Sequence, residues 1–183
     1  MLDLIIKNGK CYIDGELKDA DIAIKDKKIH KIGQISEEAK EIIDASDHTV
    51  LPGCIDTQTH FREPGSTDTE DLHTGSRAAI AGGITSVFEM PNTNPPTSNK
   101  KEFQRKLDLA KNRMFCNYAF YFGATADNAD DLASLKDLEG CCGIKLFAGS
   151  STGNLLVADE DDIDKVFKMP QKLLQLTPNM KRY

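Results

Sequence analysis

The 183-residue sequence contains no run of apolar residues that approaches the ~20 needed for a membrane-spanning helix. Its first residues, Met1–Lys7, are too few and too charged to form a secretory signal peptide. We therefore expect no membrane anchor and no export of the protein.

A basic block is also absent, because Lys and Arg are interspersed with Asp and Glu and the formal net charge is −6. Nucleic acid is therefore not an expected partner. The hydrophobic content of 39% and the charged content of 28% are those of an ordinary globular protein. At this length the chain can hold one domain, or one domain with a small appendage.

The five cysteines form no Cys-x-x-Cys pair and are odd in number, which argues against zinc fingers and disulfide frameworks. Cys54, Cys116 and Cys142 lie in apolar strand-like runs, where a free cysteine behaves as a small hydrophobe. Unpaired cysteines are typical of a reducing compartment, so we predict a cytoplasmic location. The sequence Gly-x-x-x-x-Gly-Lys-Ser/Thr of a phosphate-binding loop is missing too.

Residues 1–50 have the pattern of short strands separated by tight turns. Asn8-Gly9 and Asp14-Gly15 each lie between apolar runs, and such pairs are strong hairpin signals. We expect a β-rich segment.

After residue 50 the pattern becomes one of strands alternating with helices. Strands are predicted at 50–56, 84–90, 115–122 and 143–148. Helices are predicted at 68–81, after Ser98, from Asp127 and at 159–167. Repeated βα units indicate a parallel sheet with right-handed crossovers, which can be either an open doubly wound sheet or part of a barrel. No fifth strand is predicted after Phe167, and Pro170 interrupts any continuing helix.

Polar side chains follow the first of these strands, whose apolar residues are predicted to be buried. Asp56, Gln58 and His60 come at period two, so their side chains are expected to leave one face of the strand. Arg62 follows, just before the turn at 63–65. A polar row at a strand end is costly to bury unless it coordinates or pairs with something, although a solvent-facing strand end explains any one of these residues.

Four motifs of this region are similar to those of the long-chain (class I) dihydroorotases, members of the amidohydrolase superfamily. They are His-Phe-Arg-Glu-Pro-Gly at 60–65, Thr-Gly-Ser-Arg-Ala-Ala at 74–79, Ala-Gly-Gly-Ile-Thr at 81–85 and Met-Pro-Asn-Thr-Asn-Pro at 90–95. The likeness runs from about the N-terminus to residue 167. It implies a small β-sandwich segment over 1–50 and the first four βα units of a TIM-like (β/α) barrel over 51–167.

A complete barrel of this kind has eight βα units in ~250 residues. We therefore interpret the chain as the N-terminal portion of a dihydroorotase-like protein, with an atypical tail at 168–183. Half a barrel leaves its outermost strands as open edges, and such edges invite association. We predict that the chain forms a homo-oligomer.

The resemblance implies that Asp56 is catalytic and that His60 binds zinc. One departure matters, because Gln58 stands where the family carries its first metal histidine, and an amide oxygen is a far poorer ligand. Lys145 is a single cation in an apolar strand; in the family a lysine here becomes a carbamate that bridges two metals and serves catalysis. The alternatives for Lys145 are a side chain that reaches the strand end, or one that pairs with Glu89.

Arg62 and Asn92 are implied to hold the carboxylate of the substrate, which a guanidinium fork and an amide both suit. Ser151 lies in a hydroxyl-rich loop, 149–153, that is expected to bind substrate as a lid. The simpler alternatives are an exposed charge for Arg62, a turn residue for Asn92 and a glycine-bounded turn for the loop.

The implied reaction is the metal-assisted interconversion of dihydroorotate and N-carbamoyl-aspartate in pyrimidine biosynthesis. Because Gln58 replaces a ligand and the family draws further ligands from later strands, we expect this chain alone to be inactive. Two alternatives stay open. One is a non-catalytic structural partner of aspartate carbamoyltransferase, and the other is a sister amidase, an allantoinase or hydantoinase.

Overall fold

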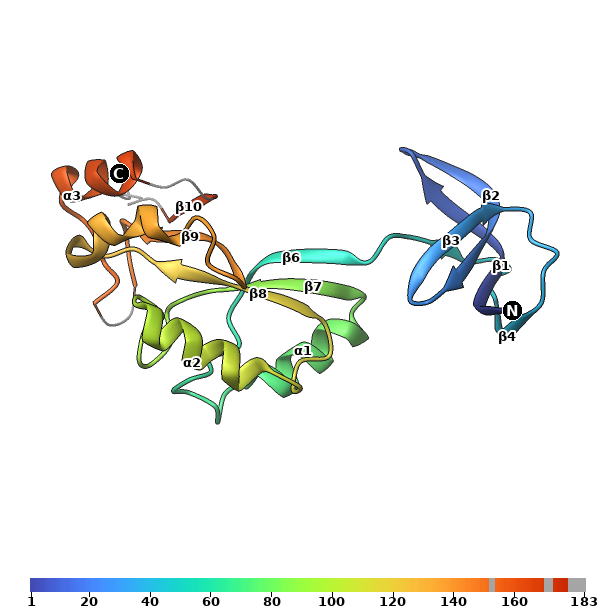
Figure 1. Ribbon diagram of the computed structural model, residues 1–183, viewed down its shortest axis with the longest axis horizontal. Coiled ribbons are helices and arrows are strands. Elements are labelled where there is room, and N and C mark those ends of the chain that lie inside the picture. The colour runs from blue at the N-terminus through green and yellow to red at the C-terminus, as the bar shows by residue number, and fades with distance from the viewer. Residues whose placement is uncertain (152–153, 170–172, 178–183) are drawn as a thin grey trace. The chain divides into compact units, whose positions relative to one another are not determined.

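The computed structural model describes residues 1–151, 154–169 and 173–177. The chain divides into two compact units, Met1–Pro52 and Gly53–Tyr183 (Figure 1). The predicted mixed α/β class is confirmed: a β-sandwich-like sheet is followed by a curled parallel sheet that forms half of a barrel. No helix among the described residues is long and apolar enough to cross a membrane.

The first unit is one five-stranded sheet with the order β3-β2-β1-β4, in which β5 also pairs with β1. Its strands are β1 (Leu2–Ile13), β2 (Glu16–Lys25), β3 (Lys28–Gly33), β4 (Ala39–Asp44) and β5 (Thr49–Val50). Asp14 and Gly15 have φ values of 52° and 84° and form the predicted hairpin between β1 and β2.

The predicted turn at Asn8-Gly9 is wrong, because β1 continues through it. The register with β2 shifts between Ile6 and Gly9, which marks a β-bulge. Asn8 has a φ of 63°, and its backbone N–H donates to Asp21 Oδ1 at 3.0 Å. The Asn-Gly pair therefore produces a kink within a strand instead of a chain reversal.

The second unit is built on a parallel sheet with the order β10-β9-β8-β7-β6. Its strands are β6 (Cys54–Thr59), β7 (Ile84–Glu89), β8 (Asn117–Gly123), β9 (Cys141–Phe147) and β10 (Leu174–Thr177). The helices are α1 (Leu72–Ala81), α2 (Lys100–Ala110), the 3-10 helix η1 (Ala126–Leu135) and α3 (Glu160–Lys168). Figure 1 shows α1 and α2 lying along one side of β7 and β8.

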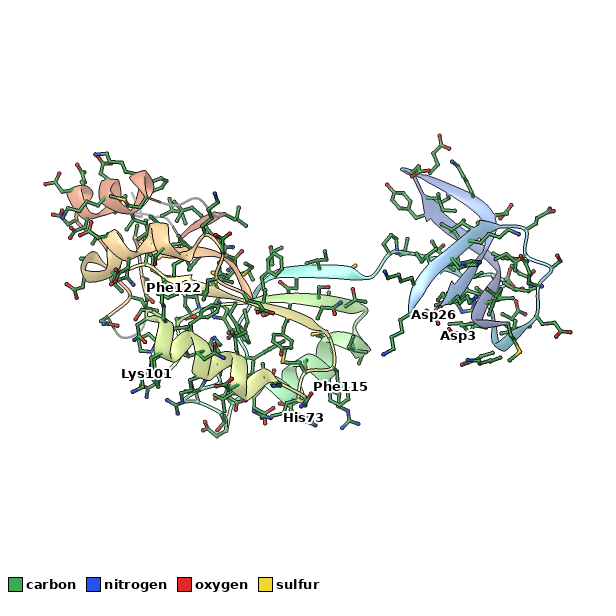
Figure 2. The ribbon with its side chains drawn as sticks, in the orientation of Figure 1. Asp3, Asp26, His73, Lys101, Phe115 and Phe122 are labelled. Atoms are coloured by element: carbon green, nitrogen blue, oxygen red, sulfur yellow. The ribbon has the colours of Figure 1, made fainter. Side chains whose placement is uncertain are left out.

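Capping side chains fix where these helices begin. The Asp71 carboxylate accepts the Thr74 backbone N–H at 2.7 Å, which completes a capping box for α1. Asn99 caps α2 in the same way through Glu102 N. From α2, Phe103 packs against Phe120 and Phe122 of β8, with ring centroids 6.4 and 6.1 Å apart. Figure 2 shows Phe122 in this layer between strand and helix.

The prediction that no strand follows Phe167 is wrong. Strand β10 pairs in parallel with β9, from Leu174 opposite Ile144 to Thr177 opposite Phe147. The short Leu-Gln-Leu-Thr run carries a weak strand pattern, and the open edge of β9 supplies the partner that makes it a strand. The other parts of the predicted tail, 170–172 and 178–183, lie outside the described residues.

The prediction of a buried first strand is also wrong. Leu51 is 60% exposed and Ile55 is 59% exposed. Strand β6 is the last strand of the sheet order, so within this chain nothing pairs with its outer edge in the described residues. An apolar run predicts burial only where a neighbouring strand or helix covers it.

Candidate active site

The candidate site begins where β6 ends. The register of β6 with β7 shifts between Asp56 and Thr59, which places one extra residue in β6. The predicted period-two row is therefore broken by a bulge, and His60 lies just past the strand. Within the bulge the half-buried Asp56 accepts the backbone N–H of Gln58 through Oδ1 at 2.9 Å.

His60 and Asn92 are in direct contact, which the sequence did not indicate. His60 Nδ1 lies 2.9 Å from Asn92 Oδ1, and Asn92 follows β7, the neighbour of β6. Because the amide oxygen only accepts, Nδ1 carries the proton and Nε2 is left with its lone pair. Burial, together with the charge of Arg62, holds the pKa of His60 below its ordinary value, although the bond to Asn92 opposes this. The ring is therefore neutral and presents Nε2.

Arg62 and Asn92 line one pocket of about 280 Å³, together with Pro64, Ser66, Thr93, Asn94 and Pro96. Arg62 is half-buried with a φ of 60°, and no ion pair within the described residues engages its guanidinium. The turn after it packs tightly against the loop of Asn92: a Cβ on Gly65 would lie 2.7 Å from that of Asn94. The structure thus brings the two predicted carboxylate-binding residues together.

Two buried carboxylates, Glu63 and Glu89, accept hydrogen bonds that fix residues 61–72, a role that the sequence pattern did not indicate. Glu63 accepts Arg113 Nη1 at 2.7 Å and the Leu72 backbone N–H at 2.9 Å. Glu89 accepts the Phe61 backbone N–H at 3.2 Å. A charged residue on the buried stripe of a helix, such as Lys106 between Phe103 and Ala110, is the sequence signal that could have pointed to a partner for Glu89.

Lys145 lies on β9 and is 1% exposed. Its ammonium is 5.1 Å from the centroid of the Phe147 ring, and desolvation lowers its pKa. The alternative in which Lys145 pairs with Glu89 is wrong, because Glu89 pairs with Lys106 of α2. Within the described residues Lys145 makes no salt bridge, so no opposite charge there offsets the burial of its ammonium.

Gln58 makes a contact that ties β6 to β10. Gln175 Nε2 donates to Gln58 Oε1 at 2.9 Å, although the two strands are at opposite ends of the sheet order. Gln175 is in register with Lys145 on the neighbouring strand, so their side chains leave the same face. The curl of the sheet therefore brings Gln58 and Gln175 together across its inner face.

Ser151 follows β9 and is half-buried. Thr152 and Gly153, which complete the predicted lid, lie outside the described residues. A role for Ser151 in substrate binding stays a prediction.

The side chains of the described residues do not supply enough ligands for a metal centre. No group of three or more His, Cys, Asp or Glu side chains is placed to hold a metal ion in the part of the chain that the structure describes. Asp56 and His60 remain as ligand types, and Gln58 contributes only an amide oxygen that already accepts from Gln175. We therefore assign no reaction step to a metal.

Comparison with known proteins decides the family. Residues 49–154, which contain His60, Arg62, Asn92 and Lys145, match the profile of the Amidohydrolase family. The chain belongs to the amidohydrolase family. An allantoinase from Escherichia coli O1:K1 / APEC is 40% identical over 177 residues, which are 95% of this amidohydrolase and 39% of the allantoinase.

Solved structures agree with this. The L-hydantoinase (dihydropyrimidinase) from Arthrobacter aurescens superposes with a TM-score of 0.82 at 30% identity, over 91% of this chain and 38% of that one. A D-hydantoinase gives a TM-score of 0.81 at 27% identity, over 96% and 39%. These relatives are an allantoinase and hydantoinases, so the predicted superfamily is confirmed and the narrower dihydroorotase assignment is not carried by them. This amidohydrolase spans about two fifths of their length (39%).

Proposed function

We propose that this amidohydrolase is of the type that opens a small cyclic amide of the allantoin or hydantoin class. The observation that carries the proposal is the shared pocket of Arg62 and Asn92 beside His60, within a segment related to an allantoinase at 40% identity. A pocket of about 280 Å³ suits one small polar ring.

Within this proposal the residues have distinct tasks. Arg62 and the amide nitrogen of Asn92 donate to the carbonyl oxygens of the ring. Asp56 is the half-buried carboxylate proposed to be catalytic, whereas the aspartate that moves a proton to the departing ring nitrogen is expected from later strands of the family. Lys145 is the candidate for carboxylation, and Ser151 for closing over the ring. The zinc expected from the resemblance stays an expectation, because the described donors do not complete its site.

A dihydroorotase is the second candidate, and one observation favours it. Arg62 offers a guanidinium fork without an ion-pair partner among the described residues, and such a fork matches a carboxylate. Dihydroorotate carries a carboxylate, whereas allantoin and hydantoin do not. The motifs at 60–65 and 90–95 point the same way.

Ligand-observed NMR with allantoin, hydantoin and dihydroorotate, one at a time, tests both candidates without requiring turnover. We expect at least one ring to bind and Arg62→Gln to weaken it, while Arg105→Gln, an exposed site on α2, serves as the control. Binding of dihydroorotate alone would select the second candidate. If no ring binds, the pocket is not a substrate site. Ring opening, assayed in parallel, is expected to be absent because of Gln58.

A non-catalytic role, in which the chain binds another protein, is an alternative to the enzymatic proposals. Loss of a metal ligand at Gln58 suits a non-catalytic partner of aspartate carbamoyltransferase. The outer edges of β6 and β10, which are unpaired within the described residues, suit self-association. Co-elution with purified aspartate carbamoyltransferase in size-exclusion chromatography tests the first. A cytoplasmic location belongs to the same set of proposals and is checked by cell fractionation.

A further inference from the structure

Lys106 and Glu89 form an ion pair that is closed off from solvent beside the candidate site. Lys106 is 0% exposed and Glu89 is 1% exposed. The ammonium of Lys106 pairs with Glu89 Oε2 and donates to the backbone oxygen of Met90 at 2.8 Å. It also lies 5.0 Å from the centroid of the Phe120 ring. Burial raises the pKa of Glu89 and lowers that of Lys106, while their mutual attraction opposes both shifts.

The ion pair makes hydrogen bonds to the backbone just after β6 and just after β7, where the site residues lie. Glu89 Oε1 accepts the N–H of Phe61, the residue between His60 and Arg62. Lys106 binds the carbonyl of Met90, which precedes Asn92 by two residues. The backbone N–H of Met90 in turn donates to Thr59 at 2.9 Å. The ion pair therefore links the end of β6 to the end of β7.

Close packing at this position does not by itself explain why two charged side chains, Glu89 and Lys106, are buried there. Taking two charges out of water is costly, and well-packed apolar residues of similar volume often serve stability as well or better. A carboxylate offers what an apolar side chain lacks: an acceptor for the N–H of Phe61 that is fixed in place by a second buried group. By binding the N–H of Phe61, that acceptor restrains the backbone between His60 and Arg62.

We propose that Glu89 and Lys106 are positioning residues, which fix the backbone at Phe61 and Met90 so that His60, Arg62 and Asn92 keep their mutual arrangement. The inference rests on the proposed function in taking these three residues as the site.

Two double variants separate positioning from stability. Lys106→Met with Glu89→Gln removes both charges and keeps an acceptor for the N–H of Phe61. Lys106→Met with Glu89→Leu removes the charges and the acceptor together, and Glu89→Met replaces Glu89→Leu if that protein does not fold. Lys101→Met is the matched control, because Lys101 lies on the exposed side of α2 (Figure 2).

Three measurements are made on each variant at one fixed pH: the urea midpoint, the 15N shift of His60 Nδ1, and the affinity for whichever ring amide the wild type binds. We expect the acceptor-free variant to have the lower midpoint, because it leaves the buried N–H of Phe61 without an acceptor. Only the acceptor-free variant is expected to lose the protonated Nδ1 signal, and its affinity should fall about tenfold, the usual effect of one hydrogen bond. Lys101→Met should match the wild type throughout.

Equal His60 signals and equal affinities in the two double variants would overturn the proposal and leave the pair a purely structural one. If the wild type binds no ring while the acceptor-free variant still changes the His60 signal, positioning stands and the proposed function fails. The two failures are thereby distinguished.

Discussion

The side-chain oxygen of Asn92 lies 2.9 Å from Nδ1 of His60 and joins the ends of two neighbouring parallel strands. This bond fixes the tautomer of His60, because the amide oxygen has no proton to give. It also leaves the amide nitrogen of Asn92 directed to other acceptors. Asn92 therefore serves two tasks, in orienting His60 and in lining the pocket with Arg62.

Replacement of Asn92 by Ala should cost about 1 kcal/mol in the free energy of unfolding, the typical effect of losing one hydrogen bond to a half-buried group. Asn94→Ala is the control, because Asn94 is exposed, and a change within about 0.5 kcal/mol is expected there. Urea unfolding followed by circular dichroism measures both. Equal losses in the two variants would mean that the bond to His60 contributes nothing.

Restoration of a histidine with Gln58→His should raise the affinity for Co2+ by at least about tenfold, because an imidazole replaces a poor amide ligand. Titration with Co2+, followed by visible absorption, reports the binding. Gln104→His on the exposed side of α2 controls for a histidine added anywhere. If the two variants bind Co2+ alike, Gln58 does not occupy a ligand position.

Replacement of Lys145 by Met should stabilise the protein at pH 7, because it removes a buried ammonium that makes no salt bridge within the described residues. Desolvation lowers the pKa of Lys145 in the folded state, so the unfolded state binds the proton more tightly. The gain at pH 7 amounts to about 1.4 kcal/mol for each unit by which the pKa is lowered.

That gain from Lys145→Met should shrink as the pH rises from the folded pKa toward the ordinary value of 10.5. Urea unfolding at several pH values measures the slope. A wild-type protein heavier by one carbon dioxide in native mass spectrometry would show a carboxylated Lys145, and a loss of stability in Lys145→Met would then be the expected result.

Removal of the helix cap with Asp71→Ala should cost about 1 kcal/mol, whereas Asp71→Asn should keep most of the stability through its amide oxygen. The bond from the Thr74 backbone N–H lowers the pKa of Asp71 in the folded state. A lowered carboxyl pKa contributes stability above the unfolded value of 3.8 that is lost as the pH falls through the folded pKa. In Asp71→Asn the free energy of unfolding should therefore fall less steeply below pH 3.8, as measured by urea unfolding at several pH values. An unchanged slope would mean that Asp71 does not contribute to the acid sensitivity.

Introduction of a charge with Ile55→Lys on the open edge strand β6 should reduce self-association, because charges on an edge oppose pairing with another chain. Size-exclusion chromatography with light scattering across a range of concentrations measures it. Ile80→Lys provides a control at an exposed apolar residue away from the edge. A wild-type chain that stays monomeric at every concentration would remove the basis for the prediction.

Local patterns in the sequence determined much of the fold. The alternation of apolar strands with capped helices, as at Asp71 and Asn99, was enough to predict four βα units. The motifs at 60–65 and 90–95 were enough to place Arg62 and Asn92 in one site. These features depend on residues close together in the chain, and their physical signals are read without knowledge of the partner elements.

Only the tertiary structure decided how distant residues meet. The bond from Gln175 to Gln58 spans 117 positions, and it depends on the curl of a sheet that brings its two end strands face to face. Glu89 pairs with Lys106 and not with Lys145, and only the folded structure shows which of the two ammonium groups reaches the carboxylate. The fifth strand, the bulge at Asn8 and the exposure of Ile55 likewise follow from which neighbour is present at each strand edge, a property of the assembled sheet and not of any local segment.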